Sequence, residues 1–235
     1  MNKNSNIARL LASAAVAATA VMASNAMAGN LVQNGGFESG NNGQFWSDYT
    51  YKAAPVSPYL NEGQYSIAYN ANSTHPGFTA TAYSGSNAFY ANGASSTTQI
   101  VWETGGIYIS AAAADTYRFQ AMVCSLVPTT NGSFAPPSLA FEISADYTTW
   151  TSMGQSPSLT NVAAGVWQGS YGDLALTEGW YAIRLRNLAT AGSGNDFGLD
   201  DIYFGLASSA PSVPAPGAAA LIGLAGVIGG RRRKA

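Results

Sequence analysis

The sequence predicts an all-β protein built on a single β-sandwich domain, residues 29–206. The chain is rich in Gly, Ser, Thr, Asn and aromatic residues, and no long segment repeats apolar residues with a helical period. Short runs of alternating apolar and polar residues instead stand between turn signals. A domain of this size is long enough to bury a real hydrophobic core.

The first part of the domain carries the weaker strand signals. Leu31–Gly40 predicts a strand that is broken by Asn34-Gly35-Gly36. Residues 41–98 are polar and turn-rich with scattered aromatic residues, so we expect loops and short strands there without an assignable register.

Clearer strands follow, each with apolar residues at alternate positions: 100–102, 107–109, 116–127, 139–144, 179–187 and 198–205. In 116–127 and 179–187 the predicted core-facing residues are Tyr117, Phe119, Ala121, Val123, Tyr181, Ile183 and Leu185. Arg118, Gln120, Arg184 and Arg186 take the opposite faces. Residues 145–150 predict a hairpin turn that returns into another strand. Short strands of this kind are typical of a jelly roll.

Residues 1–28 have the three parts of a secretory signal peptide. Lys3 and Arg9 precede an uncharged stretch rich in Ala and Val, and Ala26-Met27-Ala28 is a small-x-small cleavage site. We therefore expect Ala26 and Ala28 to mark cleavage and the mature chain to begin at Gly29. The alternative is a helix that the folded protein retains.

The C-terminal end combines a linker, an apolar segment and a basic cluster. Residues 207–216 form a Pro/Ser/Ala linker, and Gly217–Gly230 is a stretch of fourteen apolar or Gly residues. As a helix it spans roughly 21 Å, short of a ~30 Å hydrocarbon core. The cations that follow are typical of a membrane stop signal, namely Arg231, Arg232, Arg233 and Lys234. Residues 217–235 thus predict a short transmembrane helix with a basic tail; the alternative is a buried C-terminal helix.

This tail resembles the PEP-CTERM sorting signal of exported bacterial proteins. The matching motif is Val213, Pro214, Ala215 and Pro216, followed by the apolar helix and the arginines, with Ala215 where the family usually has Glu. The resemblance implies recognition by an exosortase-type membrane enzyme and removal of the tail. It also implies delivery to the cell surface or extracellular matrix of a Gram-negative bacterium, after a membrane-anchored stage.

Charge and cysteine content limit the domain further. Only four basic residues lie in 29–206, against twelve acidic ones, so the domain carries a net charge of −8. Such a domain repels phosphate backbones, which argues against nucleic-acid binding. The single cysteine, Cys124, excludes an intrachain disulfide and is expected to be a buried, unreactive thiol.

The body also resembles the galactose-binding-like jelly roll of many carbohydrate-binding modules. The likeness lies in the opening NLVQNGGFESG and the closing LDDIYFG. The resemblance implies a structural Ca²⁺ between acidic residues of the first and last strands, here Glu38 with Asp200 or Asp201. Strand alternation would place Asp200 on the same face as Ile202 and Phe204. The alternative is that these acids cap turns or face water.

Exposed aromatic side chains are the candidates for stacking against sugar rings. The candidate residues are Trp46, Tyr49, Tyr51, Tyr59 and Trp102. The alternative for each is that it fills the core or braces a loop. The single histidine, His75, excludes a multi-histidine metal site, and no Gly-x-Ser-x-Gly motif is present.

We therefore expect a non-enzymatic exported protein with a structural or adhesive role in exopolysaccharide or biofilm. The alternative is a carbohydrate-binding module with a defined glycan ligand. A secreted glycan hydrolase is a third reading, for which no spacing in the sequence selects a carboxylate pair. Catalytic residues are not assigned, and the expected cofactor is at most a structural Ca²⁺.

Overall fold

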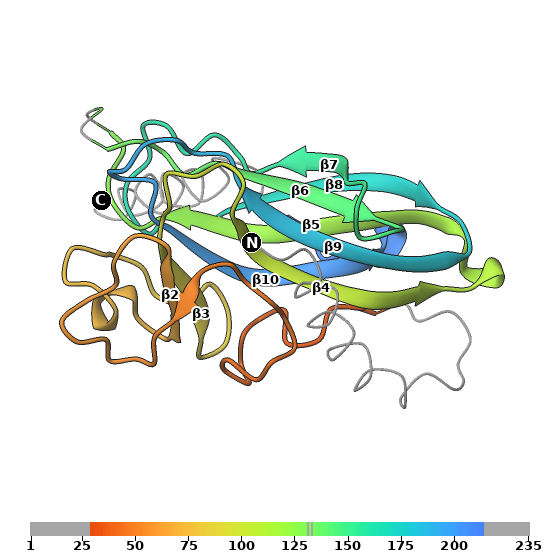
Figure 1. Ribbon diagram of the computed structural model, residues 1–235, viewed down its shortest axis with the longest axis horizontal. Helices are drawn as coiled ribbons and strands as arrows, with labels where there is room; N and C mark the ends of the chain where they lie inside the picture. Colours follow the sequence, from red (N-terminus) through yellow and green to blue (C-terminus); the bar gives the residue numbers. More distant parts are fainter. Residues whose placement is uncertain (1–28, 131, 133, 214–235) are drawn as a thin grey trace, which may run out of the picture.

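The computed structural model describes residues 29–130, 132 and 134–213. Within them it confirms an all-β jelly-roll sandwich with almost no helix (Figure 1). The longer strands are β4 (Ile100–Ile109), β5 (Asp115–Ser125), β6 (Leu139–Ser144), β8 (Gln168–Leu176), β9 (Gly179–Asn187) and β10 (Phe197–Leu206). The shorter strands are β1 (Thr50–Tyr51), β2 (Gln64–Ala68), β3 (Ala88–Asn92) and β7 (Thr151–Gln155). The 3-10 helices are η1 (Ala71–Ser73), η2 (Ala111–Ala113) and η3 (Ala207–Ser209).

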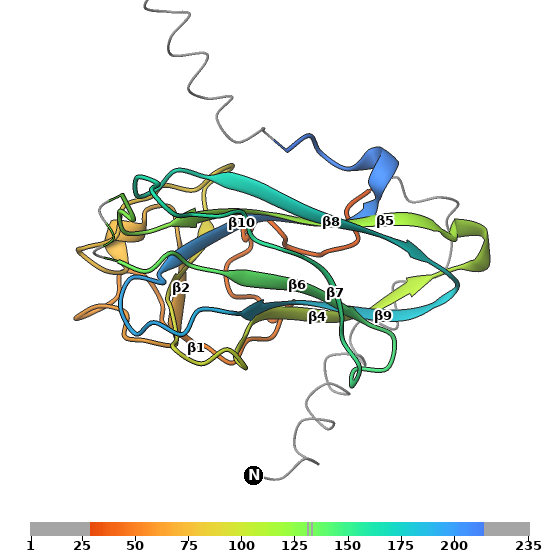
Figure 2. The ribbon, with the colours of Figure 1, turned by 90° about the horizontal axis from the view of Figure 1, so that it is seen from above.

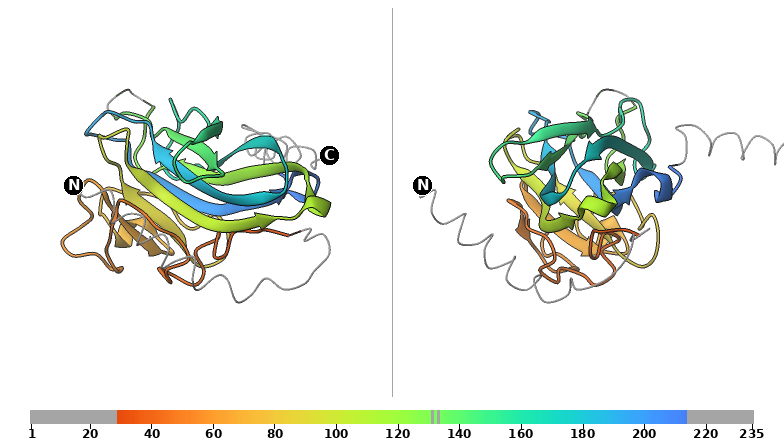
Figure 3. Two further views of the ribbon diagram at one scale, coloured as in Figure 1. Left: turned by 45° about the vertical axis from the view of Figure 1, so that its right-hand side comes forward. Right: turned by 90° about the vertical axis from the view of Figure 1, so that its right-hand side faces the viewer.

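The strands form two sheets that pack face to face, as Figure 2 shows from above. One sheet has the order β1-β2-β3-β10-β5-β8 and the other β4-β9-β6-β7. All pairs are antiparallel except β1 with β2. The segment before β4 lies along one side of the sandwich, as the two views of Figure 3 show.

The main core lies between the two sheets and is rich in aromatic rings. Phe119 of β5 contacts Phe141 of β6 and Phe204 of β10, with ring centroids 5.0 and 6.3 Å apart. All three rings are fully buried. Alternating residues of both sheets meet here because each strand buries every second side chain.

The strands with strong alternation were predicted correctly. β5, β6, β9 and β10 lie within two residues of their expected bounds, and the hairpin turn between β6 and β7 is present. The predicted core-facing residues of β5 and β9 are buried or pack against the core. The two runs at 100–102 and 107–109 belong to one long strand, β4, because bulges absorb the irregular segment between them.

Two expectations for other segments were wrong or incomplete. Leu31–Gly40 is not a strand but a series of turns, in which Asn34 and Phe37 adopt positive φ angles of 55° and 57°. It still lies beside β10, since the Ile202 amide donates to the Gly35 carbonyl at 2.9 Å. The strand β8 was not predicted, because its sequence mixes Gly and exposed polar residues.

The outer face of the six-stranded sheet is partly covered by other segments. A second apolar cluster there joins Phe78 and Leu60 from the loops to Tyr90 and Cys124 on the strands. Cys124 is fully buried as predicted, and burial raises the pKa of its thiol.

After β10 the chain crosses the same outer face (Figure 2). Val213 packs against Gly169 of β8, where a Cβ would collide with the Val213 side chain. Gly29, at the other end of the described body, lies beside Gly205 of β10. Both ends of the body therefore lie on the side of the six-stranded sheet.

The terminal signals fall outside the described residues. This applies to the predicted signal peptide, to Pro214, Ala215 and Pro216 of the sorting motif, and to the helix and basic cluster in 217–235. In the part of the chain that is described, no helix is long and apolar enough to cross a membrane.

Candidate functional site

The outer face of the four-stranded sheet carries an unusual set of polar and aromatic side chains. β9 lies between β4 and β6 in this sheet. Because Ile183 and Leu185 point into the core, Arg184 and Arg186 point outward from the same strand. The sequence predicted this outward placement, but it did not show which residues of the neighbouring strands stand beside the arginines.

Strand register aligns five residues in one row across this face. Trp46 forms an isolated antiparallel bridge with Glu103 of β4. Glu103 is paired with Arg184, Arg184 with Glu142 of β6, and Glu142 with Ser152 of β7. Paired residues of neighbouring strands project from the same face of a sheet. We call these five residues the charged row.

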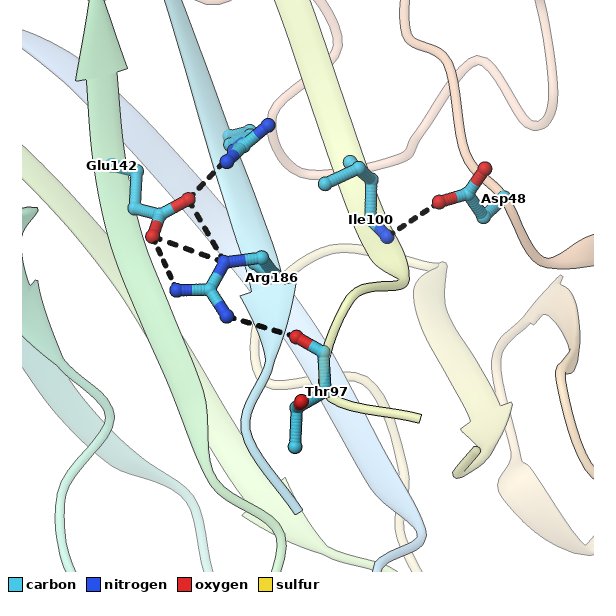
Figure 4. A network of polar contacts seen from close by, with 6 residues as sticks. Asp48, Thr97, Ile100, Glu142 and Arg186 are labelled. Carbon is cyan, nitrogen blue, oxygen red and sulfur yellow. Dashed lines mark hydrogen bonds and ion pairs between the residues drawn. The ribbon is translucent and has the colours of Figure 1, made fainter. Parts of the chain in front are cut away.

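Glu142 is the anchor of the row (Figure 4). Arg184 Nε donates to Glu142 Oε2 at 2.6 Å, and Arg186 Nη2 donates to Oε1 at 2.6 Å. Arg186 Nη1 also donates to the Thr97 carbonyl at 2.8 Å, which ties the pair to the segment before β4. Burial alone would raise the pKa of Glu142, but the arginines outweigh it and hold that pKa below its ordinary value. The carboxylate is thus ionised and fully engaged.

Two tryptophans lie beside these charges. The Arg184 guanidinium lies over the Trp150 ring, 3.8 Å from its centroid, so it covers one ring face, and Trp150 is partly exposed. Trp46, at the edge of the row, is 40% exposed. We call the surface formed by the charged row, Arg186 and Trp150 the Trp46–Trp150 face.

Glu103 is the acid of the row that lacks a hydrogen-bonding partner. No hydrogen bond from any described residue reaches its carboxylate, although the residue is only 6% exposed. Burial raises the pKa of Glu103 from 4.5 to about 7, against the opposing charge of Arg184 and with a further upward contribution from Asp48. The Asp48 carboxylate itself accepts from the Ile100 amide at 2.7 Å at the start of β4 (Figure 4).

The aromatic residues singled out from sequence divide into two groups. Tyr49 and Trp102 are buried in the core, so they are not available for stacking on a ligand. Trp46, Tyr51 and Tyr59 are exposed, and Trp46 is the one that belongs to the charged row.

The acidic residues predicted as metal ligands do lie close together, around the turn 83–87. Glu38 accepts hydrogen bonds from the backbone amides of Ser86 and Asn87, at 2.9 and 3.0 Å from Oε1. These contacts hold the Leu31–Gly40 segment against the turn.

The two aspartates bind the other half of this turn. Asp200 Oδ2 accepts from the amides of Tyr83 and Ser84 at 2.9 and 3.1 Å, and Asp201 Oδ1 accepts from the Ser84 hydroxyl at 2.7 Å. Burial raises the pKa of Asp200 to about 7, although hydrogen bonds from the backbone amides of Ser84 and Asp201 oppose the shift.

The expected orientation of Asp200 was wrong. A bulge at Asp201, whose φ is 44°, shifts the strand register, so Asp200 stands opposite Met122 on the outer face. Ile202 and Phe204 point into the core instead of sharing a face with Asp200. Asp200 is nevertheless fully buried, because the turn 83–87 covers it.

The carboxylates of Asp200 and Asp201 and the Cγ atom of Glu38 lie around Gly36. A Cβ at this position would lie 3.4 Å from Asp201 Oδ1, 3.9 Å from Asp200 Oδ1 and 4.0 Å from Glu38 Cγ. Among the described residues, however, no group of three or more His, Cys, Asp or Glu side chains has metal-holding geometry. These side chains do not form a calcium cage by themselves, since backbone amides and a hydroxyl occupy their oxygens. Calcium binding here stays a prediction.

Comparisons with known proteins identify the fold without a family. No family model matches the sequence, and no curated protein matches it. A solved Stig cyclase from Fischerella sp. TAU, in complex with an indole compound, is similar with a TM-score of 0.50 and 12% identity, over 75% of this chain and 96% of the cyclase. At this identity the likeness shows a shared fold, and a fold does not determine a function.

Carbohydrate-binding modules are also among the similar structures. The CBM22-1 xylan-binding domain from Paenibacillus barcinonensis has a TM-score of 0.44 and 14% identity, over 78% of this chain and 97% of that domain. The C-terminal family 22 module from Clostridium thermocellum has a TM-score of 0.47 and 12% identity, over 80% of this chain and all of that module.

The calcium prediction is tested by thermal unfolding with and without a chelator. If Glu38, Asp200 and Asp201 hold Ca²⁺ with nearby carbonyls, EDTA lowers the Tm and added calcium restores it. The Asp200→Asn variant then loses its response to EDTA. An unchanged Tm in EDTA contradicts calcium binding and leaves the carboxylates as ligands of the turn alone.

Stability should depend on pH through Glu103. Its pKa is higher in the folded than in the unfolded chain, so the folded protein binds the proton more tightly. The free energy of unfolding therefore rises as pH falls, by about 1 kcal/mol between pH ~8 and ~6 from this group. Urea unfolding at both pH values should show a smaller rise in Glu103→Gln. Equal rises in the two proteins would contradict the shift.

Proposed function

We propose that this protein binds a polysaccharide on the Trp46–Trp150 face and has no catalytic activity. The observation that carries the proposal is the charged row itself. It places carboxylate and guanidinium groups beside two tryptophans on one face of a sheet. Polar groups of this kind exchange hydrogen bonds with sugar hydroxyls, while the flat apolar face of a sugar ring packs on an indole.

The engaged state of the row supports binding by preorganised groups. Arg184 is held by Glu142 on one side and by Trp150 on the other, so little side-chain freedom remains to be lost when a ligand docks. Glu103 lies beside them without a hydrogen-bonding partner among the described residues, with 6% of its surface exposed. Among the readings of the sequence, this favours the glycan-binding module over a purely structural or adhesive role.

Hydrolysis is the second candidate, and one observation favours it. Glu103 and Glu142 lie on one face with pKa values displaced in opposite directions, as in an acid and base pair. Both oxygens of Glu142 are already taken by Arg184 and Arg186, which leaves no free carboxylate to act as nucleophile or base. We therefore favour binding without bond cleavage.

Binding is tested by affinity electrophoresis in gels that contain xylan, mixed-linkage β-glucan, galactomannan or alginate. At least one neutral polysaccharide should retard the purified protein. Trp150→Ala should weaken the retardation about tenfold, since a central aromatic residue of a binding surface contributes more than 1 kcal/mol. Tyr171→Ala is the matched control. Tyr171 also lies against an ion-paired arginine, with Arg118 3.6 Å from its ring centroid, but on the opposite sheet.

Two outcomes would contradict this function. If none of the four polysaccharides changes the migration of the protein, binding to glycans of these types is excluded. Release of reducing ends that is lost in Glu103→Gln would make the protein a hydrolase.

The sequence signals at the two ends support export and sorting as part of the same proposal. The signal peptide 1–28 would direct export. The apolar segment and basic tail in 217–235 would hold the chain in the membrane, where an exosortase-type enzyme would recognise the motif at 213–216. The protein would then reach the cell surface or extracellular matrix, where polysaccharide is available as its partner.

Intact mass of the protein recovered from its host tests this placement. The expected mass corresponds to a chain that begins at Gly29 and lacks the C-terminal tail. A mass that includes residues 1–28 would contradict export, and unchanged localisation after deletion of residues 213–235 would contradict sorting by the tail.

A further inference from the structure

The outer face of the four-stranded sheet carries a second group of exposed aromatic residues, beyond the charged row. Tyr108 of β4 is paired with Trp180 of β9, and their ring centroids are 5.0 Å apart. These side chains are 38% and 52% exposed. The Tyr108 hydroxyl donates to Glu178 Oε1 at 2.6 Å, which fixes the orientation of its ring. An ordered, exposed aromatic pair of this kind is suited to contact a ligand.

Tyr147 fills the space between this pair and the charged row. It comes from the β6–β7 turn, and its hydroxyl accepts from the Gly106 amide of β4 at 2.9 Å. Since β9 lies between β6 and β4, the side chain must span β9 at the level of Ala182. Small residues allow this approach, because a Cβ on Gly105 would lie only 2.7 Å from the Tyr147 hydroxyl. The ring remains partly exposed.

The three aromatic contacts follow the direction of one strand. The successive outward positions of β9 are Trp180, Ala182 and Arg184. Trp180 packs on Tyr108, the Tyr147 side chain crosses over Ala182, and Arg184 lies against Trp150. At about 3.3 Å per residue, Trp180 and Arg184 are about 13 Å apart along the strand. This length exceeds a single sugar ring, so a terminal monosaccharide would leave part of the line unoccupied. We call the line from Trp180 through Tyr147 to Trp150 the aromatic line.

The charges on and around this face argue against an anionic ligand. The described body carries an excess of eight acidic groups. Three of its four cations, Arg118, Arg184 and Arg186, are held in ion pairs with Asp173 and Glu142. The fourth, Lys52, follows β1 and bonds through its amide to Tyr65 of β2, in the six-stranded sheet. Among the described residues, this face therefore has no unengaged cation to compensate uronate or sulfate groups.

Building on the proposed function, we propose that the ligand is a linear, uncharged polysaccharide that runs along β9 and contacts the whole aromatic line. Several successive sugar rings then pack on Trp150, Tyr147 and Trp180. The charged row fixes the position of one sugar through hydrogen bonds. Affinity must consequently grow with the length of the glycan until the line is filled.

The test is isothermal titration of the purified protein with oligosaccharide ladders of xylan, mixed-linkage β-glucan and galactomannan, from disaccharide to hexasaccharide. For the glycan that binds, the hexasaccharide should bind at least about tenfold more tightly than the disaccharide. Trp180→Ala should lower this ratio about tenfold, while Tyr171→Ala leaves it unchanged. Both residues are half exposed, so neither change should alter the Tm substantially.

The outcomes separate this inference from the proposed function. No binding to any ladder or polysaccharide overturns both. Binding with equal affinity for all chain lengths, or with an unchanged ratio in Trp180→Ala, overturns the aromatic line and leaves the Trp46–Trp150 face. In the affinity gels, stronger retardation by alginate than by the neutral polysaccharides overturns the proposal of an uncharged ligand. A change of oligomeric state in Trp180→Ala, measured by sedimentation, would assign the exposed pair to self-association instead.

Discussion

The buried carboxylate of Glu142 is the constraint on which the described face depends. A charge in this position is unfavourable unless cations and donors compensate for it, and β9 supplies both arginines from one face. Their fixed position places Arg184 against Trp150 and Arg186 against the Thr97 carbonyl. This ion cluster thus fixes Trp150, at the end of the turn 145–150, and the segment around Thr97 before β4 in the same surface.

The fold was readable from the sequence where one face of a strand is buried. In β5 and β9, alternation separated Phe119 and Ile183 from Arg118 and Arg184, because core packing enforces a period of two. The strand β8 was not predicted because residues distant in the sequence, not a local alternation of apolar side chains, explain its composition. A Cβ on Gly172 would collide with the Met153 carbonyl of β7, so a glycine is needed where the two sheets approach closely. The residues around Gly172 in the sequence do not indicate this contact.

The candidate sites were only partly readable, for related reasons. The resemblance of the first and last segments led us to expect Glu38 and Asp200 near each other, and both accept hydrogen bonds from the turn 83–87. The bulge at Asp201 reversed the expected direction of Asp200. The charged row joins Trp46, Glu103 and Glu142 through strand order alone. Residues so far apart in the chain become neighbours only once the sheet is assembled, and one sequence carries no record of that pairing.

The contact of Val213 with Gly169 determines which face of the domain a tether at the C-terminal end would leave accessible. This contact lies on the six-stranded sheet, and the Trp46–Trp150 face lies on the opposite layer. If the chain were tethered through its C-terminal end, the six-stranded sheet would face the anchoring surface. The Trp46–Trp150 face would then point away from that surface, where a long polymer could contact it without steric obstruction.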